Sequence, residues 1–419
     1  MRLKPTVTHL SLSAVLSFSL LSGCQSESIS PETRSDSASR QLLVSLSHAE
    51  QEVVKSDNNF GFRLFASLAK DDPGSNIIVS PVSVSLALTM AYNGARNTTQ
   101  TVMASQLGYA GMDRAAVNSL FAKLIPALKA ADGKVQLQIA NSVWSDIGLD
   151  VEPQFLELNR ATFAAETRTL DFSAPAAAPT INDWVNINTK GLIPTVVPEP
   201  LPPDWVMVLI NALYFKGSWS QAFKTDRTYN AEFHLASGAV KTCRMMHADT
   251  NFRVFSDGKV NALELPYGDS LFSMVFLQTA APEGLPAMIA DLDAGAWDAM
   301  QDKFKVREGP IHVPKFKLEY AKSLAAVLQA MGMAEAFSGA ADFTGIRKAG
   351  DLTISDVIHK TYVNVDEEGT EAAAVTAVAI KLTAMPMDLI RLDRPFVFVL
   401  REKTSGTILF LGRIMDPTL

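Results

Sequence analysis

Cysteine is nearly absent from the sequence, which contains only Cys24 and Cys243 among its 419 residues. An excess of basic charge is also lacking, since 37 lysines and arginines against 44 acidic residues give a net charge of −7 with no dense basic run. The charge pattern therefore gives no indication of nucleic-acid or other polyanion binding. The six histidines show no metal-ligand spacing, and there is no internal repeat or heptad array. A hydrophobic content of 47% is instead typical of a chain that buries a sizeable core.

The motifs of the common enzyme classes are missing as well. The chain contains no Gly-x-Ser-x-Gly elbow, no Gly-x-Gly-x-x-Gly, no Walker loop and no His-Glu-x-x-His. Ser256 to Lys259 fits Ser-x-x-Lys, and a Ser-Asp-Asn triplet occurs at Ser56 to Asn58. In penicillin-binding serine hydrolases, however, Ser-x-x-Lys comes first and Lys-Thr-Gly follows, and neither condition holds here. We therefore expect no enzyme activity, no cofactor and no metal site.

The first 24 residues resemble an export signal. Arg2 and Lys4 precede a moderately apolar stretch that is too short to span a bilayer comfortably. The Leu-Ser-Gly-Cys sequence at 21–24 then resembles the lipobox of bacterial lipoproteins, in which the cysteine becomes the lipid-modified first residue. An ordinary signal with a chance cysteine is the alternative. We predict a signal peptide over 1–23, lipidation at Cys24 and attachment to the membrane at the bacterial cell envelope.

A polar, serine-rich segment follows the signal and is typical of a flexible tether over residues 24–46.

Acyl chains on Cys24 would anchor the protein in the membrane, because each buried CH₂ contributes about 0.8 kcal/mol to the binding free energy. Gln25 follows the cysteine where aspartate would retain a lipoprotein at the inner membrane, which favours the outer membrane, with an extracellular form as the alternative. If Cys24 is acylated, Cys243 has no partner for an internal disulfide. The stability of the exported domain then depends on its hydrophobic core.

Apolar residues at helical spacing predict three helices. These helices are expected around Phe60, Leu64 and Leu68; across residues 178–194, with Thr180 and Asp183 as an N-terminal cap and Gly191 and Pro194 at the far end; and around Leu324, Val327, Leu328 and Met331.

Continuous apolar runs at 206–215 and 271–277 predict strands that are covered on both faces. Residues 394–400 and 406–413 are separated by a short polar segment and predict a closing hairpin. Helices occur in clusters and strands often in pairs. We therefore predict an α+β fold with large, mostly antiparallel sheets surrounded by helices, in one domain over 47–419.

Small and β-branched residues dominate the stretch from 371 to 380. An alanine-rich helix or a permanent strand would each be an ordinary explanation. In a β-strand, alternate residues of this stretch would lie on opposite faces. The residues of one face are uncharged and small or apolar, whereas those of the other face include both Glu371 and Lys381. The uncharged set is Thr370, Ala372, Ala374, Thr376, Val378 and Ile380. Such a strand could enter between two existing strands with little repacking, and Gly369 supplies the backbone freedom of a hinge. The stretch is thus suited to being both loop and strand.

This region resembles the reactive-loop hinge of inhibitory serpins, and other segments resemble serpin segments in serpin order. They cover residues 76–95, 209–219, 312–319, 328–346, 357–369 and 394–418. The match extends over about 50–419 and implies the serpin fold, with an exposed reactive loop over about 367–392. It also implies a suicide inhibitor of serine proteases. The protease cleaves the loop and forms an acyl-enzyme, and the loop then inserts as a strand. A non-inhibitory binding or carrier protein of the same fold is the alternative.

The resemblance assigns roles to individual residues. The hinge consists of Glu367, Glu368, Gly369, Thr370, Glu371, Ala372, Ala373 and Ala374. The shutter, a buried polar cluster beneath the opening sheet, consists of Ser80, Ser83, Asn211 and His359, although an ordinary core histidine is the alternative for His359. The breach, where insertion begins, consists of Trp219, Lys315 and Glu367.

The position of the reactive bond follows from the same resemblance. The family's spacing from Gly369 places it at Thr383–Ala384, and counting back from Pro395 places it at Ala384–Met385. Small or medium residues there favour elastase-like or subtilisin-like proteases, whereas Lys381 is the alternative that would attract a trypsin-like enzyme. We expect a monomer whose partners are a protease and a membrane.

Overall fold

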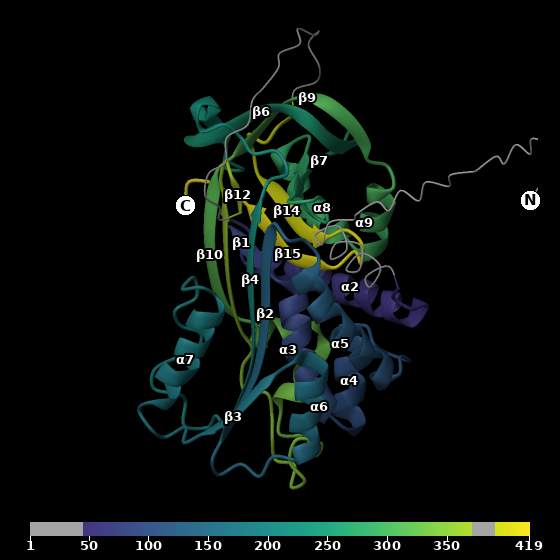
Figure 1. Ribbon diagram of the computed structural model, residues 1–419, viewed down its shortest axis with the longest axis vertical. Helices are drawn as coiled ribbons and strands as arrows, with labels where there is room; N and C mark the ends of the chain where they lie inside the picture. Colours follow the sequence, from purple (N-terminus) through teal and green to yellow (C-terminus); the bar gives the residue numbers. More distant parts are fainter. Residues whose placement is uncertain (1–44, 371–389) are drawn as a thin grey trace, which may run out of the picture.

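The computed structural model describes residues 45–370 and 390–419. The predicted signal, Cys24 and both candidates for the reactive bond lie outside these residues. Within the described residues, strands form two sheets and helices pack against both (Figure 1).

The six-stranded sheet contains the region that matters for function. Its order is β10 (Phe316–Ser323), β11 (Ile358–Val365), β12 (Gly369–Thr370), β4 (Met207–Ser218), β2 (Val135–Asp146) and β3 (Glu166–Leu170). Neighbouring strands are antiparallel, apart from the parallel pair β2 and β3.

The second sheet is larger and contains the chain's last strands. Its order is β1 (Ile77–Val79), β15 (Ile408–Ile414), β14 (Phe396–Glu402), β8 (Phe272–Thr279), β7 (Val260–Tyr267), β6 (Val240–Ser256), β9 (Lys305–Pro314) and β13 (Ile390–Arg391), while β5 (Tyr229–His234) pairs with β6. Every residue of β8, β14 and β15 is buried, which explains why apolar residues occupy both faces of these strands.

The helices are α2 (His48–Asp71), α3 (Pro81–Gly94), α4 (Asn97–Leu107), α5 (Arg114–Ala130), α6 (Pro153–Phe163), α7 (Ala177–Asn188), α8 (Leu285–Asp291), α9 (Ala294–Gln301) and α10 (Ala325–Leu328). Figure 1 shows α7 on one side of the six-stranded sheet and α3 to α6 on the other. Residues of β4 accordingly divide between two clusters. Ile210 and Ala212 pack in the smaller cluster with α7, and Leu213 and Phe215 pack in the main core.

The predicted class and most predicted elements are confirmed. The sheets are large and mostly antiparallel, and β14 pairs with β15 as the predicted hairpin. Phe60, Leu64 and Leu68 are fully buried on α2. That helix begins earlier than the apolar pattern indicated, because the side chains of Ser47 and Glu50 cap its first turn.

The predicted cap of the second helix is wrong. α7 begins at Ala177, so Thr180 lies inside the first turn, where its hydroxyl donates to the carbonyl of Ala176. The third predicted helix is also shorter than expected. α10 ends at Leu328, and the chain continues in a wider turn that contains Gly332 at a positive φ of 113°.

Candidate functional site

Within the described part of the chain, only two residues bridge the middle of the six-stranded sheet. Thr370 pairs with Val365 of β11 and with Gly217 of β4, and Gly369 pairs with Ser218. Among the described residues, no ladder joins β11 to β4 directly. The sheet is therefore split below Thr370.

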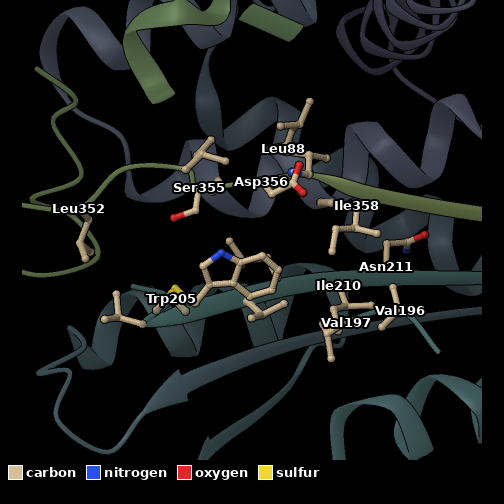
Figure 2. Close-up of a pocket in the computed structure, with 18 of the residues that line it drawn as sticks. Leu88, Val196, Val197, Trp205, Ile210, Asn211, Leu352, Ser355, Asp356 and Ile358 are labelled. Atoms are coloured by element: carbon tan, nitrogen blue, oxygen red, sulfur yellow. The ribbon is translucent and has the colours of Figure 1, made fainter. Parts of the chain in front are cut away.

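A cavity of about 490 Å³ occupies the split. Its walls come from β4, β11, α3, the segment that follows α7 and the segment that precedes β11. Figure 2 shows side chains from these elements directed into the same space, among them Leu88, Val196, Trp205, Ile210 and Ile358. The position between β4 and β11 is thus filled by strand at its upper end and is hollow below.

Gly369 is required by close contact with β4. A Cβ atom at this position would lie 2.0 Å from the carbonyl oxygen of Gly217, and the φ of Gly369 is 150°. No side chain fits so near a neighbouring backbone. The first residues of the predicted reactive loop therefore differ from an exposed loop: Gly369 and Thr370 are buried within the sheet. Similarly, Ile390 and Arg391 form β13 against β9.

The turn between β11 and β12 is held by three hydrogen bonds to its carbonyl groups. The Trp219 indole N–H donates to Asp366 O at 2.9 Å, and the Trp219 backbone N–H donates to Glu368 O at 2.8 Å. The Phe223 N–H donates to Glu367 O at 2.8 Å. Every carbonyl of the turn is thus bonded by the segment that follows β4.

A buried ion pair supports the same turn. Glu367 is 6% exposed and accepts from Lys315 Nζ at 2.5 Å and from the Thr228 hydroxyl at 2.7 Å. Burial alone would raise the pKa of Glu367, but the bonds from Lys315 and Thr228 outweigh burial and lower the pKa. The predicted breach residues Trp219, Lys315 and Glu367 therefore lie around one turn.

Tyr267 connects this turn to the inserted residues, although the sequence analysis did not single it out. Its ring stacks on Trp219 with centroids 4.2 Å apart, and its hydroxyl lies 2.6 Å from Thr370 Oγ1. Thr370 is only 3% exposed. An aromatic residue at the end of an apolar strand is ordinary core in sequence terms, so no signal marked Tyr267.

The four predicted shutter residues lie in one network across the split. The Ser80 N–H donates to His359 Nε2 at 3.1 Å, and Ser80 Oγ accepts from the Ser83 N–H at 3.3 Å. The Ser83 hydroxyl donates to Asn211 Oδ1, and Asn211 in turn donates to Asn141 Oδ1 at 2.7 Å. The start of α3 thereby links β11 to β4 and β2, and His359 and Asn211 have no direct bond.

His359 is neutral, with its proton on one ring nitrogen. Burial lowers its pKa to about 4. Because Nε2 accepts from Ser80, the proton of the neutral ring is on Nδ1. His359 lines the cavity, and nothing among the described residues accepts a hydrogen bond from Nδ1. These contacts also fit an ordinary core histidine, so a special role for His359 stays a prediction.

The site offers backbone edges on β4 and β11, a cavity between them and a few polar side chains, an arrangement that can accept an added strand. Among residues 45–370 and 390–419, no group of three or more histidine, cysteine or acidic residues could hold a metal ion. Within that part of the chain, no helix has both the length and the apolar character needed to cross a bilayer.

Comparison with known proteins agrees with this architecture. The family model described as serpin (serine protease inhibitor) matches residues 55–417. The leukocyte elastase inhibitor of Sus scrofa is 34% identical over 386 residues, which cover 88% of this chain and 100% of that protein. The structure of human thyroxine-binding globulin complexed with its hormone has a TM-score of 0.81 at 28% identity, covering 88% of this chain and 99% of that chain. The structure of the thermophilic serpin tengpin in its native state has a TM-score of 0.78 at 28% identity, covering 87% of this chain and 94% of that chain.

The chain belongs to the serpin family. Its relatives include proteins named as protease inhibitors, and this kinship supports protease inhibition in general.

The buried ion pair of the breach yields a stability prediction. Replacing Lys315 by alanine leaves Glu367 buried without its cation, which costs roughly 1–3 kcal/mol of unfolding free energy. The thermal unfolding midpoint at pH 7 should therefore fall. Because the pKa of Glu367 lies below its ordinary value of 4.5, the pair stabilises the fold above that pH. The difference between wild type and variant should therefore narrow as the solution is acidified below pH 4.5.

Lys317→Ala is the matched control, since Lys317 pairs with Glu319 at 3.0 Å but both side chains are more than half exposed. It should leave the thermal unfolding midpoint almost unchanged, because exposed ion pairs contribute little to stability. Equal midpoints for the Lys315 and Lys317 variants would contradict the importance assigned to Glu367.

Proposed function

We propose that this serpin is a suicide inhibitor of serine proteases. A protease cleaves the reactive loop and forms an ester between its catalytic serine and the new carboxyl end of the loop. The cleaved loop then inserts between β4 and β11 and carries the protease with it, which distorts the protease active site. The acyl-enzyme persists because the distorted enzyme no longer hydrolyses the ester.

The split in the six-stranded sheet is the observation that carries this proposal. β12 already occupies the top of the position between β11 and β4 in antiparallel register. His359 lies six residues before Val365 on β11, and Asn211 lies six residues before Gly217 on β4. If the loop continued in the antiparallel register of β12, Thr376, six residues after Thr370, would lie opposite both His359 and Asn211. Insertion would thus bring a loop hydroxyl to the shutter and complete a network that now has no direct link between the two strands.

The energetics favour insertion. About twelve newly paired residues, each contributing roughly 0.5–1.5 kcal/mol net through its hydrogen bond, give a driving force of order 10 kcal/mol. Thr370, the first residue of the uncharged set, is buried, and the later members lie outside the described residues. The uncleaved fold would then be kinetically rather than globally stable.

For the target, we propose an elastase-like or subtilisin-like serine protease. Support comes from the small residues at Thr383, Ala384 and Met385 and from the kinship with leukocyte elastase inhibitors. The reactive bond is Thr383–Ala384 or Ala384–Met385.

The decisive experiment mixes the protein lacking residues 1–46 with elastase, subtilisin, chymotrypsin and trypsin, followed by a denaturing gel. We expect a covalent band at the summed mass with elastase or subtilisin. The released peptide would begin at residue 384 or 385 and so identify the bond. Cleavage near residue 383 by every enzyme without such a band would instead favour a non-inhibitory binding or carrier protein.

Thr370→Arg should convert the inhibitor into a substrate. Thr370 is already buried in β12 before cleavage, so an arginine there would place an unpaired charge beneath the sheet and displace β12, from which the inserting loop must extend. The ratio of cleaved protein to covalent complex on the gel should rise strongly. Glu371→Arg is the matched control, because the sequence analysis places Glu371 on the solvent-facing set, and it should still form the complex. Efficient complex formation by Thr370→Arg would refute the assigned set.

We also propose that the protein is lipid-anchored through Cys24, at the outer membrane. Labelling of growing cells with a fatty-acid analogue should mark the wild-type protein in the outer-membrane fraction. Cys24→Ser should abolish the label, whereas Cys243→Ser should retain it, because Cys243 is buried on β6. Unlabelled wild-type protein in the medium would show an ordinary signal peptide instead.

A further inference from the structure

We propose that the cavity between β4 and β11 binds an uncharged, elongated apolar molecule with one hydrogen-bond acceptor, and that this ligand controls inhibition by occupying the path of the loop. The binding itself depends only on the uncleaved fold. The control of inhibition rests on the function proposed above.

The size and the lining of the cavity suit such a ligand. Its volume of about 490 Å³ falls within the roughly 300–1,000 Å³ of small-molecule sites. Leu88 of α3, Val196, Trp205, Leu209 of β4 and Ile358 of β11 form apolar walls on several sides (Figure 2). Water gains few hydrogen bonds against such walls, so an apolar molecule that displaces it is favoured.

The polar groups of the cavity define the one acceptor. Ser83 and Asn211 already satisfy each other, and Asn211 also donates to Asn141. His359 differs, because it lines the cavity and no described residue accepts a hydrogen bond from its Nδ1–H. A carbonyl or ether oxygen near His359 would complete the hydrogen bonding of a buried ring.

The charged residues at the cavity argue against an anionic ligand. Asp146, Asp204, Asp351 and Asp356 line it together with only two cations, Arg347 and Lys360. Arg347 is paired with Asp351 at 2.8 Å, and Lys360 donates to the Thr195 hydroxyl at 3.2 Å. The remaining acidic side chains outnumber Lys360, so a carboxylate in this cavity would be repelled more than attracted and would be costly to bury.

A ligand at this site would compete with strand addition. The cavity is lined by Met207 to Ala212 of β4 and Ile358 to Lys360 of β11, below the point that β12 reaches. Insertion would have to displace the ligand before the shutter is passed. Slower insertion gives the protease time to hydrolyse the ester, so the ligand would shift the reaction from inhibition to simple cleavage.

The probe for the test is 6-propionyl-2-(dimethylamino)naphthalene, an uncharged aromatic ketone whose emission shifts to the blue in apolar surroundings. It is titrated against the full-length protein and against the full-length Ala87→Phe variant, both in the same detergent because of the proposed lipid anchor. Partition of the probe into the detergent is then equal in the two titrations. Ala87 lines the cavity from α3 and is partly accessible, so phenylalanine there would fill the space. Wild type should show saturable, blue-shifted binding, and the variant at least about tenfold weaker binding.

Ala87→Val extends the series to a smaller change, in case phenylalanine disrupts the fold. It should weaken binding by an intermediate factor, with near-ultraviolet circular dichroism as the check on folding. Absence of saturable binding to wild type, or equal binding to wild type and the folded variants, would overturn the proposed site.

The regulatory part is tested with the protease that forms the covalent complex. Saturating probe should raise the number of inhibitor molecules cleaved per protease trapped, and loop-cleaved protein should no longer bind the probe. An unchanged number at saturation would overturn the regulation. If none of the four proteases forms a covalent complex and the cleaved protein still binds the probe, loop insertion would be overturned instead, and the ligand site would stand on the titration.

Discussion

The architecture depends on how the backbone groups along β11 and β4 are paired. Within residues 45–370 and 390–419, only the two residues of β12 provide partners between these strands, and below them the strand edges border a cavity. Backbone N–H and C=O groups without partners in such surroundings are costly, and one further strand would satisfy them. In the proposed mechanism, that strand is held in reserve until a protease releases it. The native sheet is then a state maintained by a barrier rather than by the lowest free energy.

Two anchor points bracket the open part of the sheet, and they use different chemistry. At the top, the backbone carbonyls of the turn after β11 are bonded by the segment after β4, and Glu367 is neutralised by Lys315. Lower down, the anchor consists of side chains that reach across the start of α3. The upper anchor fixes where a new strand must begin. The lower anchor joins β11 to β4 only through α3, so the strands can part there without breaking a direct bond between them.

The sequence predicted the fold more completely than it predicted the site. Apolar runs identified β8 and the β14–β15 hairpin, because those strands are buried on both faces. The cap expected at Thr180 failed, because a hydroxyl can bond equally well to a carbonyl one turn earlier inside a helix. The hydrogen bonds Tyr267–Thr370 and Thr228–Glu367 join residues more than 100 positions apart, and local patterns contain no trace of such contacts. Family resemblance, rather than periodicity, singled out Ser80, Ser83, Asn211 and His359.

The close approach of Gly369 to Gly217 also sets a boundary for the divergence of this protein. The segment from Asp366 to Thr370 is fixed in the sheet by three features: the close backbone contact of Gly369, the hydrogen bond from the Trp219 indole, and the buried Glu367. Few substitutions in this segment would therefore be tolerated. These contacts end at Thr370, ahead of the residues that a protease would read. Under the proposed mechanism, new specificities would therefore arise by exchange of residues beyond Ile380, around the reactive bond, while the small uncharged set needed for insertion is kept.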